Sequence, residues 1–244
     1  MSEKQIRCTA LMLAAGSGSR MKAGVRKQYL ELGGMPLFLH SVRTMNACGI
    51  ITDLVLVVPE GDEAYCRDLA KQHGADGKLR AICDGGAERF LSAAKGLEAV
   101  TWPCDYVFIH DCARPFLDEE TIRRLFDAVQ KERACVAGMR SKDTVRITDA
   151  DGYGEMTPDR SNVWVVQTPQ VFEYDLIREA NRRLLRDVET AGGKKVRVTD
   201  DAMVVESMMH CRIRMVESSY RNIKVTTPED LPLAEALLRD IQKE

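Results

Sequence analysis

Short apolar runs alternate along the chain with longer segments in which apolar residues recur at helical spacing. Short, continuous apolar runs are typical of strands that are buried on both faces of a parallel sheet. Five such runs lie in the first 140 residues: Thr9–Leu13, Leu54–Pro59, Leu79–Cys83, Tyr106–His110 and Ala134–Met139. The segments between them predict helices over Pro36–Cys48, Asp62–Gln72, Glu88–Val100 and Asp118–Lys131. The alternation predicts an α/β fold with a doubly wound, mostly parallel, Rossmann-like sheet and helices on both faces.

The pattern breaks at Ser141. Residues 141–166 alternate only weakly, at Val145 and Ile147, turn at Asp149–Gly152 and stay polar through Arg160. We expect a β-arm that projects from a single domain of residues 1–244 and pairs with another subunit. A surface hairpin without a partner is the alternative, and the pattern does not separate the two.

The α/β pattern resumes after Gln167–Gln170. It predicts helices over Glu173–Arg186, Ala202–Met209 and Pro228–Gln242, a strand over Cys211–Val216 and a further candidate strand over Asn222–Val225.

Composition and charge exclude several classes of function. The chain has 244 residues, of which 45% are hydrophobic and 30% charged, with a net charge of −2. General nucleic-acid binding is not expected at this charge. The N-terminus has no apolar signal-peptide region and no run approaches 18 apolar residues, so we expect no membrane span. None of the eight cysteines forms a C-x-x-C pair and the four histidines are scattered. These features predict a reduced, cytoplasmic chain without a zinc or histidine metal centre.

The stretch Leu13–Gln28 is the strongest chemical signal. Small residues come first and four cations follow: Ala14, Ala15, Gly16 and Gly18, then Arg20, Lys22, Arg26 and Lys27. Glycine backbone N–H groups can approach an anion closely, and the cations suit a nucleoside triphosphate. Met21 stands where a Walker A loop or a dinucleotide fingerprint needs glycine, so both of those motifs fail. An ordinary glycine turn with solvated cations is the alternative.

Polar residues follow two other predicted strands, at Asp84-Gly85-Gly86 and at Asp111. Ligands of parallel sheets bind beyond the carboxyl ends of the strands, where the loop at Gly16 also lies. Asp111 is a candidate ligand for Mg²⁺, which takes one or two carboxylates together with substrate phosphates. Alternatively, Asp111 caps the following helix or pairs with Arg114.

The residues also carry a family resemblance. The segments LAAGSGSRM, KQYLEL, DGGAERFLSAAKGL, HDCARPF, KDT, DRSNVWVVQTPQVF, TDDAMVVE and NIKVTTPEDLPLAE occur in this order over nearly the whole length. Together they resemble the 2-C-methyl-D-erythritol 4-phosphate cytidylyltransferases, a family of the nucleotidyltransferase superfamily. The glycine loop alone belongs to that wider superfamily.

The resemblance implies transfer of a cytidylyl group from CTP to the sugar-alcohol phosphate, with release of pyrophosphate. It implies that Arg20 and Lys27 stabilise phosphate charge, that Lys224 lies near the α-phosphate and that Asp111 binds the metal. It further implies a cytosine and ribose site formed by Ala14, Ala15, Gly16, Gly86 and Ser92.

The acceptor side follows from the same resemblance. Thr144 and Arg160 match arm residues that reach the methylerythritol phosphate, and Thr168 matches a further substrate-side position. In the family the arm crosses to the neighbouring subunit of a homodimer. Three positions depart from the pattern: Arg26 stands in place of proline, Ala87 in place of an acidic residue and Arg221 in place of aspartate.

Two other hypotheses remain. A ribitol 5-phosphate cytidylyltransferase shares the glycine loop, HDxxRPF and NIKVTTP, although LAAG, DRSNVW and TDDA are closer to the methylerythritol enzymes. A nucleotide-binding regulatory paralogue without catalysis is the second. The joint presence of Arg20, Lys27, Asp111 and Lys224 is an argument against it.

Overall fold

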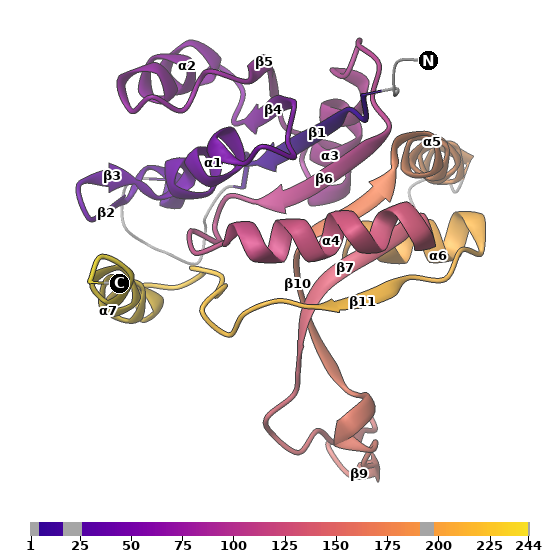
Figure 1. The fold of residues 1–244 in the computed structure, drawn as a ribbon. Helices are drawn as coiled ribbons and strands as arrows, with labels where there is room; N and C mark the ends of the chain where they lie inside the picture. The colour runs from indigo at the N-terminus through magenta and orange to yellow at the C-terminus, as the bar shows by residue number, and fades with distance from the viewer. Residues whose placement is uncertain (1–4, 17–25, 191–197, 244) are drawn as a thin grey trace.

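A seven-stranded sheet forms the centre of the molecule (Figure 1). The computed structural model describes residues 5–16, 26–190 and 198–243. In spatial order the strands are β11 (Arg214–Glu217), β7 (Ala134–Arg140), β10 (Trp164–Glu173), β6 (Tyr106–Asp111), β1 (Cys8–Leu13), β4 (Asp53–Val58) and β5 (Leu79–Asp84). All neighbours run parallel except β10, which is antiparallel to both β6 and β7. The expected mostly parallel, doubly wound sheet is therefore confirmed.

Helices cover both faces of this sheet (Figure 1). One face carries α1 (Leu37–Ala47), α2 (Glu63–Gln72) and α4 (Glu119–Glu132), and the other carries α3 (Arg89–Glu98), α5 (Tyr174–Thr190) and α6 (Asp201–Met209). The last helix, α7 (Asp230–Ile241), packs on a small hairpin of β2 (Glu31–Leu32) and β3 (Met35–Pro36). The sequence interpretation missed this hairpin, although Gly33 and Gly34, with φ of 59° and 79°, form the glycine pair that such tight turns favour.

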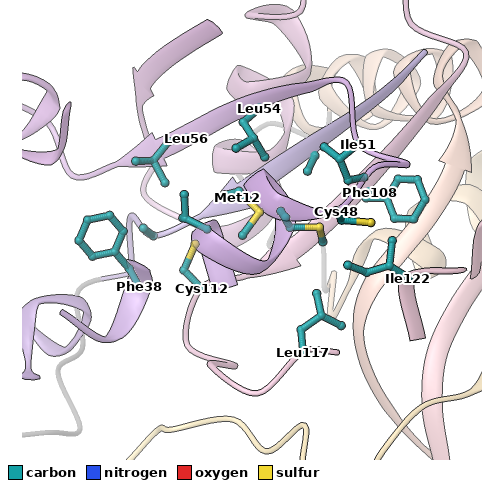
Figure 2. Packing of buried hydrophobic residues seen from close by; sticks show 14 of the residues in the cluster. Met12, Phe38, Cys48, Ile51, Leu54, Leu56, Phe108, Cys112, Leu117 and Ile122 are labelled. Carbon is teal, nitrogen blue, oxygen red and sulfur yellow. The ribbon is translucent and has the colours of Figure 1, made fainter. Parts of the chain in front are cut away.

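Alternation along each central strand divides the core into two layers. Met12 and Phe108 point to the side of α1 and α4, where Figure 2 shows them among Phe38, Ile51 and Ile122. Leu11 on the adjacent position of β1 points to the opposite layer, under α3 and α5. Because successive strand residues face opposite sides, a continuous apolar strand supplies both layers. The sheet is thus buried on both faces, and the predicted site residue Asp111 lies at the end of its strand.

The segment after Ser141 differs in part from its expectation. The arm contains a short hairpin of β8 (Ile147–Thr148) and β9 (Gly154–Met156), followed by the 3₁₀ helix η3 (Arg160–Asn162), and it projects away from the sheet (Figure 1). However, residues 164–166 belong to β10, and Gln167–Gln170, expected as a lead into a helix, lie inside that strand. The register against β7 shifts between Val166 and Gln170, around Pro169. A proline, which cannot donate to the ladder, concealed the central strand.

The remaining elements agree with the expected ones apart from their ends. Asp118 caps α4 by accepting a hydrogen bond from the Thr121 backbone N–H at 2.6 Å, as its position before the helix indicated. Asn222–Val225 forms no strand, because its one backbone bond to the sheet region runs from the Val225 N–H to the Ala113 carbonyl oxygen, at 2.8 Å. All eight cysteines are unpaired. Within the described ranges, no helix has the length and apolar character needed to cross a bilayer.

The close packing of α3 on the sheet depends on Gly96. A Cβ atom at this position would lie 2.2 Å from Leu11 Cδ1 and 2.8 Å from Val57 Cγ2. We therefore expect Gly96→Ala to lower the free energy of unfolding by about 1–3 kcal/mol, even though alanine favours helix. Urea unfolding followed by circular dichroism measures this change. Gly49→Ala is the control, since nothing lies within 4 Å of that Cβ. Equal effects of the two substitutions would contradict the packing argument.

Candidate active site

Four parallel strands end at one edge of the sheet and bring the predicted polar residues together. Leu13 pairs with Asp111 in register, and Val58 pairs with Asp84. A cavity of about 430 Å³ opens at this edge. Eight predicted site residues line it: Ala14, Ala15, Gly16, Lys27, Gly86, Ser92, Asp111 and Lys224. A larger cavity of about 530 Å³, between α1 and α7, contains none of the predicted site residues. The residues that line the smaller cavity, rather than its volume, therefore identify it as the candidate site.

The glycine turn after β5 forms one wall. The Gly85 N–H donates to the Val58 carbonyl oxygen at 2.8 Å, and the Gly86 N–H donates to Ser92 Oγ at 3.0 Å. A Cβ atom on Gly85 would lie 2.2 Å from Ala15 Cβ, so only glycine allows this turn to approach the loop after β1 so closely. Ser92 Oγ also lies 3.2 Å from the Glu88 carbonyl oxygen. Its hydroxyl thus bonds to the residue before α3 and supports the turn as well.

Asp111, the last residue of β6, lies between two cations. Its Oδ1 accepts from Arg89 Nε at 3.0 Å and its Oδ2 accepts from Lys224 Nζ at 2.6 Å. Burial raises the pKa of this carboxyl, but Arg89 and Lys224 outweigh burial and hold the pKa well below its usual range. Asp111 is therefore a carboxylate at neutral pH.

The alternative roles of Asp111 are not observed. Arg114 instead donates from Nη1 to the Asn222 carbonyl oxygen at 2.8 Å, and Asp118 caps the following helix. The Arg114 side chain thereby connects the end of β6 to the segment that carries Lys224.

The donor set limits which metal the site can hold. Among the described residues, no group of three or more His, Cys, Asp or Glu side chains could hold a metal ion. Asp111 and Glu88 are the carboxylates that line the cavity, and one or two carboxylates plus substrate phosphates are a common ligand set for Mg²⁺. The residues thus fit a cation that arrives with a polyphosphate rather than a metal that the protein holds alone.

Thr168 lies beneath Asp111 rather than in the open cavity. Its Oγ1 accepts from the Asp111 N–H at 3.1 Å and lies 3.1 Å from His110 Nδ1, while His110 Nε2 lies 3.2 Å from the Arg114 carbonyl oxygen. The carbonyl can only accept, which assigns the His110 proton to Nε2 and makes Nδ1 the acceptor for the Thr168 hydroxyl. Thr168 is 4% exposed. Its observed contacts fix the backbone of Asp111.

The remaining predicted residues lie elsewhere. Thr144 and Arg160 are exposed on the arm and do not line the cavity of their own chain, and Arg160 Nη1 donates to the Lys142 carbonyl oxygen at 3.2 Å. Arg20 lies outside the described residues. Three residues that the sequence interpretation missed also contribute: Arg89 and Gln28 line the cavity, and Asp201 pairs with Arg89. Arg89 and Asp201 lie in the segments DGGAERF and TDDAMVVE quoted above. A charged residue inside a motif was the signal that could have identified them from the sequence.

Two of the three departures have a local explanation. Arg26 forms an ion pair with Asp62 at the start of α2, which ties the end of the glycine loop to the domain. The Arg221 guanidinium lies 4.0 Å from Asp240 and lines the cavity beside α7 rather than the candidate site. Ala87 lines the candidate site.

The neutral state of His110 predicts a pH dependence of stability. Burial lowers its pKa from 6.5 to about 4, so between these values the unfolded chain binds a proton that the folded chain does not. The free energy of unfolding should therefore fall as the pH drops from 6.5 to 4, with about 3 kcal/mol from this residue. His110→Asn, which keeps an acceptor for Thr168, should lose that part of the slope in urea unfolding series. His210→Asn, at an exposed position with φ of 52°, should keep it. An unchanged slope in His110→Asn would contradict this assignment.

Comparisons with known proteins identify the family to which this chain belongs. Residues 8–240 match the family described as IspD, 2-C-methyl-D-erythritol 4-phosphate cytidylyltransferase. Proteins of that name from Lachnoclostridium phytofermentans and Lachnospira eligens are 41% and 40% identical, over 96% and 95% of this chain and 97% and 99% of their own lengths. The crystal structure of 4-diphosphocytidyl-2C-methyl-D-erythritol synthase from Anaerococcus prevotii is 33% identical, with a TM-score of 0.83 over 96% of both chains. The chain belongs to the 2-C-methyl-D-erythritol 4-phosphate cytidylyltransferase family.

Proposed function

We propose that this chain converts CTP and 2-C-methyl-D-erythritol 4-phosphate to 4-diphosphocytidyl-2-C-methyl-D-erythritol and pyrophosphate, in non-mevalonate isoprenoid biosynthesis. The observation that carries the proposal is the convergence of Lys27, Asp111 and Lys224 on one cavity with the small residues after β1. Such a cavity offers a close backbone approach for a nucleoside and cations for its phosphates. Family membership supplies the acceptor and the cytidine preference.

Positioning and charge stabilisation are sufficient for this chemistry. A phosphate oxygen of the acceptor attacks the α-phosphorus of CTP in line, the bond to the pyrophosphate oxygen breaks, and pyrophosphate leaves with the bonding electrons. Charge grows on the phosphate oxygens in this step, and preorganised cations lower its barrier. We assign this role to Lys27 and Lys224, and to Arg20 by its place in the same loop. The reaction requires no covalent intermediate on the protein.

We assign the nucleoside to the wall formed by Ala14, Ala15, Gly16, Gly86 and Ser92. These residues are small, so their backbone groups can meet a planar base at close range. A divalent cation such as Mg²⁺, held by Asp111 and the CTP phosphates, would offset phosphate charge. The buried side-chain amide of Gln28 also borders this cavity and has no hydrogen-bond partner among the described residues. Its unmet hydrogen bonds indicate that the pocket is completed by another polar group.

We propose that the acceptor is held in part by a second copy of this chain. Thr144 and Arg160 lie on an arm that projects from the domain (Figure 1), and neither residue lines the cavity of the same chain. The arm and its base expose large apolar side chains, with Tyr153 75%, Met156 54% and Val165 56% exposed. Apolar groups so exposed on a projecting hairpin suit a protein interface. A homodimer in which each arm reaches the partner's cavity explains both features.

We also propose that the protein is cytoplasmic, because its unpaired cysteines fit that location.

Competition between acceptors tests the proposed reaction. Wild-type protein with CTP and Mg²⁺ should release pyrophosphate with methylerythritol phosphate at least about 100-fold faster than with ribitol 5-phosphate, since an acceptor that leaves buried polar groups unpaired is rejected strongly. A coupled pyrophosphate assay measures both rates. Preference for ribitol 5-phosphate would support the ribitol enzyme, and CTP binding without turnover of either acceptor would support a regulatory paralogue.

Mixed dimers test the shared site. Lys27→Ala should lower kcat by about 100-fold or more through lost charge stabilisation. Arg160→Ala should mainly raise the KM for the acceptor, because a guanidinium suits its phosphate. Subunits of the two variants, unfolded and refolded together at equal amounts, should recover roughly a quarter of wild-type activity, since half of the dimers then contain one intact site. Each variant refolded alone is the control. Absence of recovery, with dimers verified by light scattering, would contradict the crossing of the arm.

A further inference from the structure

Four charged side chains form a chain of alternating sign at the edge of the candidate site. Asp201 Oδ2 accepts from Arg89 Nη1 at 2.7 Å, Arg89 Nε donates to Asp111 Oδ1 at 3.0 Å, and Asp111 Oδ2 accepts from Lys224 Nζ at 2.6 Å. Asp201 is 1% exposed and Asp111 is 8% exposed. The proposed reaction assigns roles to Asp111 and Lys224 but none to Arg89 or Asp201. An ion pair with a buried carboxylate and no assigned role calls for an explanation, because desolvation of the charges is costly.

The two oxygens of Asp111 have partners of different kinds. Oδ1 is held by a planar guanidinium that contacts a second carboxylate at the same time, so its position is fixed from two directions. Oδ2 is held by a single ammonium on a flexible stem, and the Lys224 side chain is 34% exposed. Lys224 also lies in a segment without regular secondary structure. One oxygen of Asp111 is thus clamped, and the other has a partner that can be exchanged.

The clamp is itself anchored to the sheet. Asp201 is the first residue of α6, where the helix N-terminus favours a negative charge. Gln170 on β10 fixes this end, because its Nε2 donates to Asp200 Oδ2 and its Oε1 accepts from the Ala202 N–H, both at 2.9 Å. Asp200 in turn accepts from the Met203 N–H at 2.9 Å. The buried carboxylate of Asp201 therefore has little freedom to move.

Arg89 needs this anchor. It is the first residue of α3, and a helix N-terminus disfavours a positive charge. Burial lowers the pKa of the guanidinium, but Asp201 and Asp111 outweigh burial and leave the net pKa raised. The cation is thus stable at this helix end because two carboxylates flank it.

We propose that Arg89 and Asp201 are positioning residues that hold Asp111 Oδ1, so that Asp111 Oδ2 alone changes partner, between Lys224 Nζ and a divalent cation. This inference rests on the proposed function, in which Lys224 acts on the α-phosphate and Asp111 binds the metal. When Lys224 turns to a phosphate, Oδ2 becomes available, while Arg89 keeps the carboxylate in place and oriented. Because Arg89 and Asp201 hold Oδ1, the Asp111 side chain does not have to reorient when Oδ2 changes partner.

Binding of Mn²⁺ tests the clamp separately from catalysis. Asp201→Asn keeps the shape of the side chain but removes the charge that anchors Arg89. Apparent Mn²⁺ affinity, measured by electron paramagnetic resonance with CTP and no acceptor, should fall about 10-fold or more, as for other residues that orient a metal ligand. The value of kcat should fall in parallel, while the KM for methylerythritol phosphate should change little. Arg89→Lys, which keeps one charge but cannot contact both carboxylates with a planar fork, should show the same loss of affinity.

Glu173→Gln is the matched control. It removes a carboxylate that pairs with Arg133 at 2.7 Å on the outside of the domain, and it should leave Mn²⁺ affinity unchanged. Circular dichroism identifies the variants that are folded. If Asp201→Asn does not fold, Arg89→Lys alone tests the clamp. Folded Arg89→Lys with wild-type Mn²⁺ affinity would overturn the proposal. So would wild-type protein that turns over CTP yet binds Mn²⁺ no better than Asp111→Asn. Failure of the wild type to turn over CTP at all would instead overturn the proposed function.

Discussion

The carboxylate of Asp111, held between Arg89 and Lys224 at the end of β6, is the interaction on which the candidate site depends. It joins distant segments, since Lys224, in the region before α7, lies 113 residues from Asp111 in the sequence and Arg89, at the start of α3, lies 22 residues from it. An isolated charge at this depth would be strongly unfavourable, and losing one partner of a buried pair costs about 3–5 kcal/mol. Asp111, Arg89 and Lys224 therefore stabilise one another. They come together only when the chain is folded, because they lie on distant segments.

The doubly wound sheet provides the frame that this set requires. Its parallel strands end along one edge, so Asp111, the Asp84 turn and the loop after Leu13 meet there without any of them lying in the core. The antiparallel strand β10 contributes from the other direction. Its Thr168 fixes the Asp111 backbone, and its Gln170 fixes the start of α6, which carries Asp201. The antiparallel strand thus places Thr168 and Gln170 next to the edge of the sheet at which the candidate site lies.

Local patterns predicted what depends on local physics. Apolar runs gave the strands, the cap at Asp118 gave the start of α4, and the position of Asp111 after a buried strand indicated its place in the site. The ion pairs of Arg89 were not predictable in this way, because Asp201 lies 112 residues further along the chain. Strand β10 was missed for a related reason. Pro169 and the register shift break its periodicity, and only pairing with β6 and β7 makes the segment a strand.

The two halves of the proposed reaction are built in different ways. We assign the nucleotide side to strand ends and tight turns that pack closely on one another, such as Gly85 against Ala15. We assign the acceptor side to Thr144 and Arg160, on an exposed arm that a short hairpin and its base support within the described part of the chain. A group that must orient a phosphate for in-line attack needs more order than an isolated hairpin supplies, because two strands alone are marginally stable in water. Contact with a second copy would provide that order and bury the apolar side chains of the arm at the same time. For this reason we propose that the exposed arm forms half of a shared site.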